Sequence, residues 1–369
     1  MKIQLSPNKE VYNFCEPYII AEIGANHNGD MDLAKKMIDS AVECGCDAVK
    51  FQSWTPKSLI AKEEYDRNQS YDDSPKKHFG SLKEMVEKYY LRDDQHEELK
   101  NYCQEKGVDF CSSPFSIEEI DMLVKLNVPF LKIASMDINN IPFLKYAAKT
   151  MKPIVVSTGM STLAEIETAV QTIRNEGNQN IVLLHCISIY PPKDKDIHLR
   201  NISMLQQAFN LPIGFSDHSF GASIPLASVA LGACVIEKHF TLDKDLPGWD
   251  HEISANPVEM KTICEDSKKI AAALGNVYRT VSDEEEQGRC DLGRGQADQA
   301  RHDPGRADQE AGDAAAGAGQ INASTVHIKD CLNVRASVPN PAINARSGDI
   351  AYVAYTSGST GEPKGIMAP

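Results

Sequence analysis

Residues 212–241 read PIGFSDHSFGASIPLASVALGACVIEKHFT. Two short runs rich in β-branched and aromatic residues begin at Pro212 and Val235, and each ends in polar residues that include a histidine. Strand-like runs separated by helical segments are typical of βα units around a parallel sheet. This stretch therefore predicts two consecutive parallel strands whose histidines, His218 and His239, end side by side.

The same alternation extends from Tyr18 to about Gly275. Between the strand-like runs, apolar residues recur at helical spacing. Eight parallel strands close into a barrel, so the sequence predicts an α/β protein with a (β/α)8 TIM barrel. The candidate strands begin at Tyr18, Asp47, Asp109, Phe130, Pro153, Ile181, Pro212 and Val235.

Two further segments complete the predicted barrel domain, which spans residues 1–275. We expect residues 3–15 to form a hairpin that closes the bottom of the barrel. The segment from about Pro56 to Arg92 is polar and rich in Tyr and Lys, which favours a loop with one helix on the catalytic rim.

The composition changes after Gly275. Residues 284–320 contain almost no large apolar side chains and cannot support a core. We interpret residues 276–320 as a low-complexity, largely disordered linker. Residues 321–369 are of ordinary composition but too short to fold alone, so they are expected to be a short remnant of another domain.

Bulk composition excludes several classes of function. The chain has 369 residues, 42% of them hydrophobic, and a net charge of -14, which argues against general affinity for nucleic acid or anionic membranes. Its ten cysteines lack zinc-binding spacing. The N-terminus lacks the apolar core of a signal peptide, and no apolar run approaches bilayer length. A cytoplasmic protein is the expectation.

Polar residues stand at the C-terminal end of every candidate strand, where the active sites of such barrels are found. A single polar residue in such a position is usually structural, and only the coincidence across eight strands favours a function. In chain order they are Glu22, Asn26, His27, Lys50, Gln52, Ser112, Ser113, Lys132, Ser135, Asp137, Ser157, Thr158, Ser188, Tyr190, Ser216, Asp217, His218, Glu237, Lys238 and His239.

Two kinds of binding group occur in this set. His218 and His239 could hold a divalent ion with open coordination positions, with Glu22 or Asp250 completing the shell directly or through water. The ammonium groups of Lys50 and Lys132 suit a small phosphate or carboxylate. The hydroxyls expected around the same pocket are those of Ser113, Ser135, Ser157 and Ser216.

The motifs EIGANHNGD from Glu22, AVKFQS from Ala48, GFSDHS from Gly214 and KDLPGWDHEIS from Lys244 resemble the N-acetylneuraminate synthase family. The resemblance covers roughly residues 3–275. It implies that phosphoenolpyruvate condenses with N-acetylmannosamine or a related open-chain N-acyl hexosamine, while water adds and phosphate leaves. The product would be a nine-carbon 2-keto sugar acid of the sialic, legionaminic or pseudaminic type.

The resemblance also implies roles for individual residues. It makes His218 and His239 the ligands of a divalent metal such as Mn²⁺, Mg²⁺ or Co²⁺. Glu22 or Asp250 would orient or deprotonate the attacking water. The sugar contacts fall on Gln52, Asp137 and Asp250, and Ser188 stands where many members have Asn. The phosphoenolpyruvate contacts fall on Lys50, Ser113, Lys132, Ser135, Ser157, Tyr190 and Ser216.

The chain departs from the family pattern after the barrel. Family members carry an antifreeze-like domain that supplies an arginine to the neighbouring subunit, and no such domain is recognisable here. One interpretation is a frameshift, since permitted codons for residues 291–308 can encode ILVAARPIKRGTILAEQ in the next frame. The other interpretation is a genuine flexible linker. A homodimer is expected, but the missing domain weakens this inference.

Two alternatives follow from this departure. The barrel could be a catalytically impaired remnant that binds phosphoenolpyruvate or metal only. The motif YTSGSTGEPKG from Tyr355 to Gly365 resembles the phosphate-binding loop of adenylate-forming enzymes. Because such a domain needs several hundred residues, residues 321–369 are interpreted as an inactive fragment of one.

Overall fold

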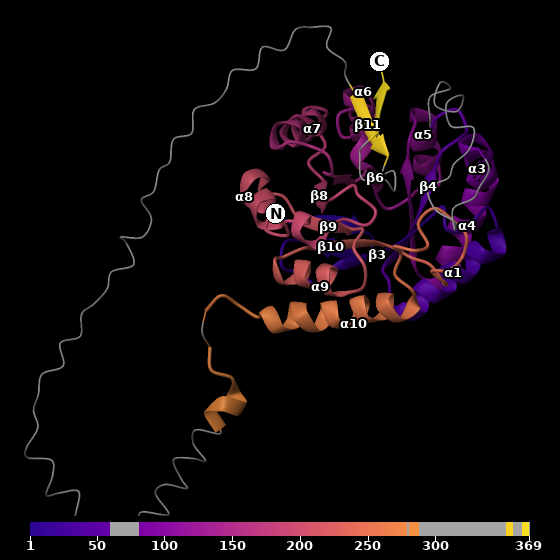
Figure 1. Cartoon of the computed structure of the whole chain (residues 1–369). Helices are drawn as coiled ribbons and strands as arrows, with labels where there is room; N and C mark the ends of the chain where they lie inside the picture. The colour runs from indigo at the N-terminus through magenta and orange to yellow at the C-terminus, as the bar shows by residue number, and fades with distance from the viewer. Residues whose placement is uncertain (60–80, 279, 288–351, 357–363, 369) are drawn as a thin grey trace, which may run out of the picture. The chain divides into compact units, whose positions relative to one another are not determined.

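Eight parallel strands form the centre of the fold, in agreement with the sequence prediction (Figure 1). They are hydrogen-bonded in the order β5-β4-β3-β10-β9-β8-β7-β6, and β5 lies next to β6, so the sheet forms a nearly closed barrel. The strands are β3 (Tyr18–Gly24), β4 (Ala48–Ser53), β5 (Asp109–Pro114), β6 (Leu131–Ile133), β7 (Ile154–Ser157), β8 (Ile181–Cys186), β9 (Ile213–Asp217) and β10 (Val235–His239).

The computed structural model describes residues 1–59, 81–278, 280–287, 352–356 and 364–368. The helices that cover the barrel are α1 (Met31–Cys44), α4 (Asp93–Lys106), α5 (Ile117–Lys125), α6 (Ile141–Lys149), α7 (Leu163–Asn175), α8 (Asn201–Phe209), α9 (Ser223–Ala230) and α10 (Pro257–Leu274). Short 3₁₀ turns occur at η1 (Ser135–Asp137) and η2 (Asp194–Asp196).

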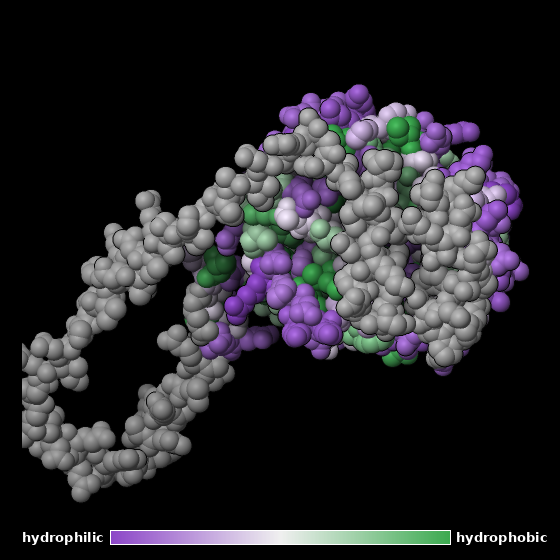
Figure 2. All heavy atoms as spheres, turned by 45° about the horizontal axis from the view of Figure 1, so that its top comes forward, coloured by the Kyte–Doolittle hydropathy of each residue, from purple (hydrophilic) through white to green (hydrophobic). Residues whose placement is uncertain are grey.

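The helices begin at polar caps and bury one apolar face. Asp30, Thr162 and Asn256 cap α1, α7 and α10 by accepting hydrogen bonds from free backbone N–H groups. On α1, Met37 and Ile38 are fully buried. The coloured surface in Figure 2 is mostly hydrophilic along its top and right edges, as expected where the polar helix faces meet water.

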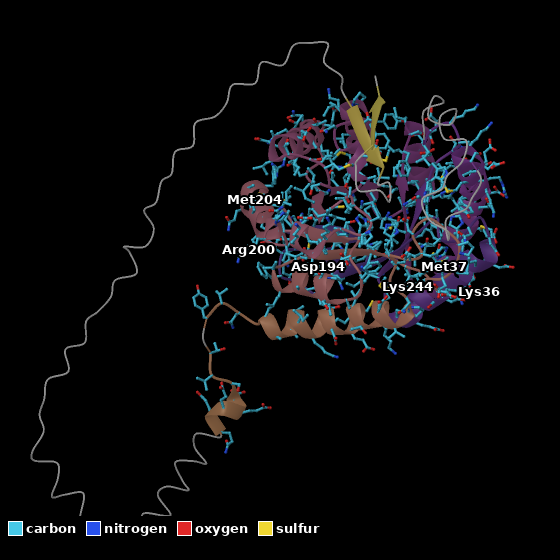
Figure 3. All side chains as sticks on the ribbon, viewed as in Figure 1. Lys36, Met37, Asp194, Arg200, Met204 and Lys244 are labelled. Carbon is cyan, nitrogen blue, oxygen red and sulfur yellow. The ribbon has the colours of Figure 1, made fainter. Side chains whose placement is uncertain are left out.

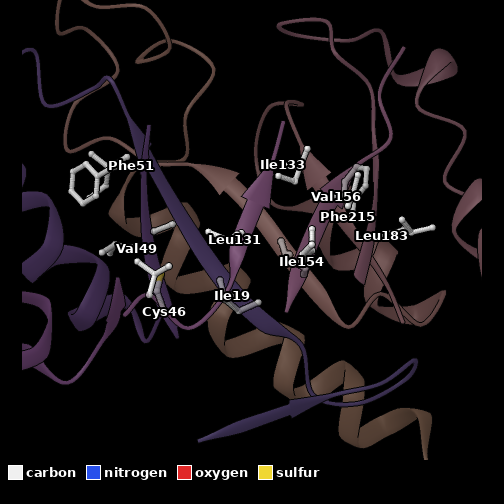
Figure 4. Close-up of a cluster of buried hydrophobic side chains, with 14 of the residues drawn as sticks. Ile19, Cys46, Val49, Phe51, Leu131, Ile133, Ile154, Val156, Leu183 and Phe215 are labelled. Carbon is white, nitrogen blue, oxygen red and sulfur yellow. The ribbon is translucent and has the colours of Figure 1, made fainter. Parts of the chain in front are cut away.

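Side chains of each strand alternate between two apolar layers. Ile19 and Val49 face outward and pack beneath the helices, together with Leu131 and Ile154 (Figure 4). Ile20 of β3 faces inward and belongs to a separate inner cluster. This inner layer fills only the lower part of the barrel, so the next inward-facing position on each strand lies at its C-terminal end.

The N-terminal hairpin closes the bottom of the barrel, as predicted. Strands β1 (Ile3–Ser6) and β2 (Lys9–Val11) pair antiparallel. Ile3, Leu5 and Val11 are buried in the same cluster as Tyr18 and Phe130 from the beginnings of the barrel strands. The hairpin therefore seals the inner layer from water.

The rim helix predicted between Pro56 and Arg92 is α3 (Leu82–Tyr89). Its Met85 and Val86 pack on Trp54, which follows β4, and Trp249 lies against the same cluster. Residues 60–80 of this predicted loop lie outside the described residues. Within the described part of the chain, no helix is long and apolar enough to span a bilayer.

Strands β11 (Tyr352–Thr356) and β12 (Lys364–Ala368) pair antiparallel near the C-terminus. Most of the predicted linker and residues 357–363 of the predicted phosphate loop lie outside the described residues. The domain boundaries proposed for residues 276–320 and 321–369 therefore stay predictions.

Candidate active site

The upper inward-facing positions of the barrel are polar and charged. Because side chains alternate along a strand, Glu22 faces inward two positions after Ile20, and Lys50 does so two positions after Ala48. All of these groups are buried although they are charged or polar. They comprise Glu22, Lys50, Ser113, Lys132, Ser157, Ser216 and Glu237.

These groups form one connected network. Lys50 Nζ lies 2.6 Å from Glu22 Oε2 and donates to Ser113 Oγ at 2.9 Å. Glu237 joins the two lysines, because its carboxylate lies 3.8 Å from Lys50 and 3.5 Å from Lys132.

Further hydrogen bonds extend the network to the hydroxyls and to Gln52. Lys132 donates to Ser157 at 2.7 Å, and Ser216 donates to Glu237 at 2.9 Å. Gln52 donates to Glu22 at 2.9 Å. The structure thus brings together most of the anion-binding residues predicted from the sequence.

Burial and mutual contact change the proton affinities of the charged groups. Burial raises the pKa of Glu22 to about 7, against the opposing effect of Lys50. Burial lowers the pKa of Lys132. For Lys50 the carboxylates of Glu22 and Glu237 outweigh burial and raise its pKa. Glu22 therefore titrates near neutrality inside a site that holds two ammonium groups.

His218 and His239 meet above this network, as predicted. Their ring centroids lie 5.4 Å apart, and the ring of Tyr190 lies 4.0 Å from that of His218. The Nδ1 atom of His218 lies 2.8 Å from the carbonyl oxygen of Ile187. Since a carbonyl only accepts, Nδ1 carries a proton, and Nε2 has a free lone pair whenever the ring is neutral.

His239 has the features of a neutral imidazole. Burial, followed by the charge of His218, holds the pKa of His239 well below its usual value. Its Nδ1 atom is buried, makes no hydrogen bond, and lies 3.8 Å from Asp250 Oδ2. A buried nitrogen without a hydrogen bond is costly unless another group binds the ring.

The two histidines fit a divalent metal in part. The Nδ1–H group of His218 is held by a backbone carbonyl, which is the usual arrangement behind a metal-binding imidazole. Among the described residues, however, no group of three or more His, Cys, Asp or Glu side chains is placed to hold a metal. The remaining ligands would have to be water or substrate oxygens, which is typical of a catalytic site.

Ser135 and Ser188 both lie close to Gly159. Ser135 Oγ accepts a hydrogen bond from the Gly159 backbone N–H at 3.1 Å. A Cβ atom at Gly159 would lie 2.8 Å from Ser135 Oγ, and Ser188 would be closer still. A glycine is therefore required for both hydroxyls to approach this part of the rim.

Asp137 has different polar neighbours from the lysine network. Burial raises the pKa of Asp137 to about 7 against the opposing hydrogen bond with Asn140, and the charge of Glu119 adds to the rise. Its Oδ2 atom is buried and makes no hydrogen bond. Asp137 is therefore placed to receive a hydrogen-bond donor, and no hydrogen bond or ion pair described here links it to the lysine network.

The loop between β10 and α10 carries Asp250. Asn26 donates to Ser254 at 2.9 Å, and Ser254 donates to the Asp250 carbonyl at 2.6 Å. His251, which the sequence did not single out, hydrogen-bonds to Thr241 at 2.7 Å. These buried contacts fix the backbone that presents Asp250 to His239.

Two other site residues received no role from the sequence. Glu237 stands at a strand end, and its position two residues before His239 could have identified it as inward-facing. Cys186 lies beside His218, whose charge, opposing burial, lowers the Cys186 pKa. By contrast, Lys238 and Asp217 form a buried ion pair at 2.7 Å and do not contact the lysine network.

The fold defines the class of the protein, a (β/α)8 barrel with a charged site at the C-terminal ends of its strands. The chain belongs to the NeuB family, whose model matches residues 37–279. This confirms the family resemblance predicted from the motifs. A second family model, that of the AMP-binding enzymes, matches residues 240–369, in agreement with the resemblance of the tail.

Individual relatives agree with this assignment. The N,N'-diacetyllegionaminic acid synthase of Campylobacter jejuni is 42% identical over 275 residues, covering 73% of this chain and 80% of that protein. The N-acetylneuraminate-9-phosphate synthase of Drosophila melanogaster is 44% identical over 247 residues, or 67% of this chain and 66% of that protein.

A solved structure is also similar. The N-acetylneuraminic acid synthetase of Leptospira borgpetersenii, in complex with citrate, superposes with a TM-score of 0.68 at 35% identity. The match covers 78% of this chain and 95% of that one.

Proposed function

We propose that this chain condenses phosphoenolpyruvate with an N-acyl hexosamine, forming a carbon–carbon bond and releasing phosphate. The observation that carries the proposal is the pair of buried lysines, Lys50 and Lys132, surrounded by serine hydroxyls at the barrel mouth. Buried ammonium groups are costly unless an anion is bound or nearby, and phosphoenolpyruvate supplies both a carboxylate and a phosphate.

The chain's own groups would bind and orient this anion. Lys50 and Ser113 form one donor pair, and Lys132 and Ser157 form another. An arriving anion would compete with Glu22 for Lys50, at the 2.6 Å contact. Glu22, released from that contact, could then accept a proton from the water that adds at C2 of phosphoenolpyruvate.

His218 and His239 would hold a divalent metal, which when bound supplies a Lewis acid toward the sugar aldehyde. The Ile187 carbonyl fixes the orientation of the His218 ring. Asp250 lies close enough to His239 to orient that ring or to accept a hydroxyl proton of the sugar. Of the proposed ions Mn²⁺, Mg²⁺ and Co²⁺, the imidazole nitrogens favour the two transition metals, since Mg²⁺ prefers oxygen ligands.

The sugar would lie on the side of Gln52, Asp137 and Asp250. The named products of the relatives support an N-acylated amino sugar, since they include N,N'-diacetyllegionaminic acid and N-acetylneuraminate-9-phosphate. The orphaned Oδ2 atom of Asp137 suits a sugar hydroxyl or amide N–H. Ser135, Ser188, Tyr190 and Ser216 would complete the pocket.

The test is phosphate release from phosphoenolpyruvate by the purified chain with Mn²⁺ and a panel of N-acyl hexosamines. Release that depends on both the sugar and the metal is the expected outcome. The alternative, a catalytically impaired remnant, predicts that the chain still binds phosphoenolpyruvate but releases phosphate with none of the sugars. The connection of both lysines with three serine hydroxyls in one network favours the synthase over the remnant. A homodimer and a cytoplasmic location remain predictions, and gel filtration would test the first.

A further inference from the structure

Two thiols far from the candidate active site are in contact inside the barrel wall. The Sγ atoms of Cys46 and Cys264 lie 3.7 Å apart, although the residues are separated by 218 positions in the sequence. Cys46 precedes β4, and Cys264 lies on α10. Their exposed fractions are 9% and 1%, so a small reagent can approach Cys46 first.

The pair lies where the barrel closes on itself. The first barrel strand, β3, is hydrogen-bonded on one side to β4 and on the other to the last strand, β10. The last helix, α10, packs on α1 beside this seam (Figure 1). Figure 3 shows Lys244, which pairs with Glu259 of α10 at 2.6 Å, at the same edge of the barrel as Lys36 and Met37 of α1.

A third thiol lies nearby but is otherwise engaged. Cys44 donates its S–H to the carbonyl oxygen of Pro257 at 3.3 Å. The contact between sulfur atoms is made by Cys46 and Cys264, which identifies them as the reactive pair.

We propose that Cys46 and Cys264 form a reversible disulfide that covalently joins the first and last βα units of the barrel. The oxidant is a small disulfide or a diazene. With a small disulfide, the Cys46 thiolate attacks one of its sulfurs and expels a thiol, and the Cys264 thiolate then displaces the second thiol. Two protons and two electrons leave the protein, and one S–S bond forms. With a diazene, the N=N group takes up these protons and electrons and becomes a hydrazine.

The structure also indicates that this reaction is slow at neutral pH. The hydrogen bond between the thiols, together with burial, raises the pKa of Cys46 well above its usual value. Only the thiolate attacks, so oxidation accelerates as the pH rises. Once formed, the bond restricts the unfolded chain over a loop of more than two hundred residues, which is a large entropic constraint.

The experiment treats the full chain with diamide, a diazene, at pH 8.5 under native conditions. Mass spectrometry of a non-reduced digest should identify a peptide that links Cys46 to Cys264. The melting temperature should rise by about 5 °C or more and return to its starting value after dithiothreitol.

Variants separate this disulfide from general thiol oxidation. Cys46→Ala and Cys264→Ala should each abolish the linked peptide and the rise in melting temperature, whereas the matched control Cys44→Ala should retain both. If a variant does not fold, the digest of the unchanged chain still decides. Recovery of Cys46 and Cys264 as free thiols after diamide treatment, or a Cys44–Cys264 linkage, would overturn the proposal.

Discussion

Lys50 Nζ lies 2.6 Å from Glu22 Oε2, and both side chains are almost completely buried. Lys132 and Glu237 make a second, longer contact of 3.5 Å in the same network. The two lysines thus face two carboxyl groups before any substrate binds, and one of these, Glu22, titrates near neutrality. An anion that enters must displace a carboxylate, so the site can recognise substrate only by exchanging one buried charge partner for another.

Replacement of Lys132 by Met should reduce sugar-dependent phosphate release by about 100-fold or more, because a charge-assisted donor to the anion is lost. The KM for phosphoenolpyruvate should rise as well. The control is Lys125→Met, which removes an exposed lysine on α5. Equal rates for the Lys132 variant and the control would contradict the proposed anion site.

Replacement of His218 by Ala should abolish tight Mn²⁺ binding, measured by isothermal titration calorimetry, and with it metal-dependent turnover. The exposed residue His198 provides the control, as His198→Asn, since Asn tolerates the positive φ of 51° there. Turnover that persists unchanged in a chelator would count against a metal role for both histidines.

Asp137 should make the protein less stable at alkaline pH. Its pKa is raised by burial to about 7 in the folded state, so the native protein holds a proton that the unfolded chain has already lost. The stability from this group is complete below about pH 4 and is lost as the pH rises through 7.

The free energy of unfolding of Asp137→Asn, relative to that of the unmodified protein, should therefore be higher at pH 8 than at pH 5 by a few kcal/mol. Urea unfolding at both pH values measures this difference, with the exposed carboxylate variant Glu167→Gln as control. An identical pH dependence for Asp137→Asn and the unmodified protein would show that Asp137 ionises freely.

Gly214 on β9 should tolerate no side chain. A Cβ atom there would lie 2.6 Å from the Val235 carbonyl oxygen and 2.5 Å from Leu184. Gly214→Ala should lower the free energy of unfolding by about 1–3 kcal/mol through overpacking. Gly107→Ala, which meets no atom within 4 Å, should cost only the strain of its positive φ. A smaller loss at Gly214 than at Gly107 would refute this.

The barrel was predictable because its strands and helices have distinct local patterns. The runs that begin at Tyr18 and Ile181 are β-branched and bounded by polar turns, and each became a strand close to the predicted limits. The hairpin of residues 3–15 was also predicted correctly. Closure of the barrel depends on pairing between strands far apart in the sequence, such as β3 with β10. In the sequence, only the count of eight strands suggested this closure.

The site was predictable as a set of residues but not as a network. Sequence spacing placed Lys50 and His239 at strand ends, and alternation along the strand could also have shown which of Glu237 and Lys238 faces inward. The strand parity decides this: Glu237 joins the lysines, while Lys238 pairs with Asp217. The exact partner of each buried charge depends on contacts between strands distant in sequence, which no local pattern encodes.

The register at the closure of the barrel has a consequence for the chemistry. His239 lies opposite Glu22, and Glu237 lies opposite Ile20, across the β3–β10 pairing. A slip of one residue along this single pairing would turn Lys238 into the interior and expel Glu237 and His239 together. Correct assembly of the last strand therefore decides two site groups together, because one alignment error at this pairing removes both the carboxylate of Glu237 and the imidazole of His239 from the interior.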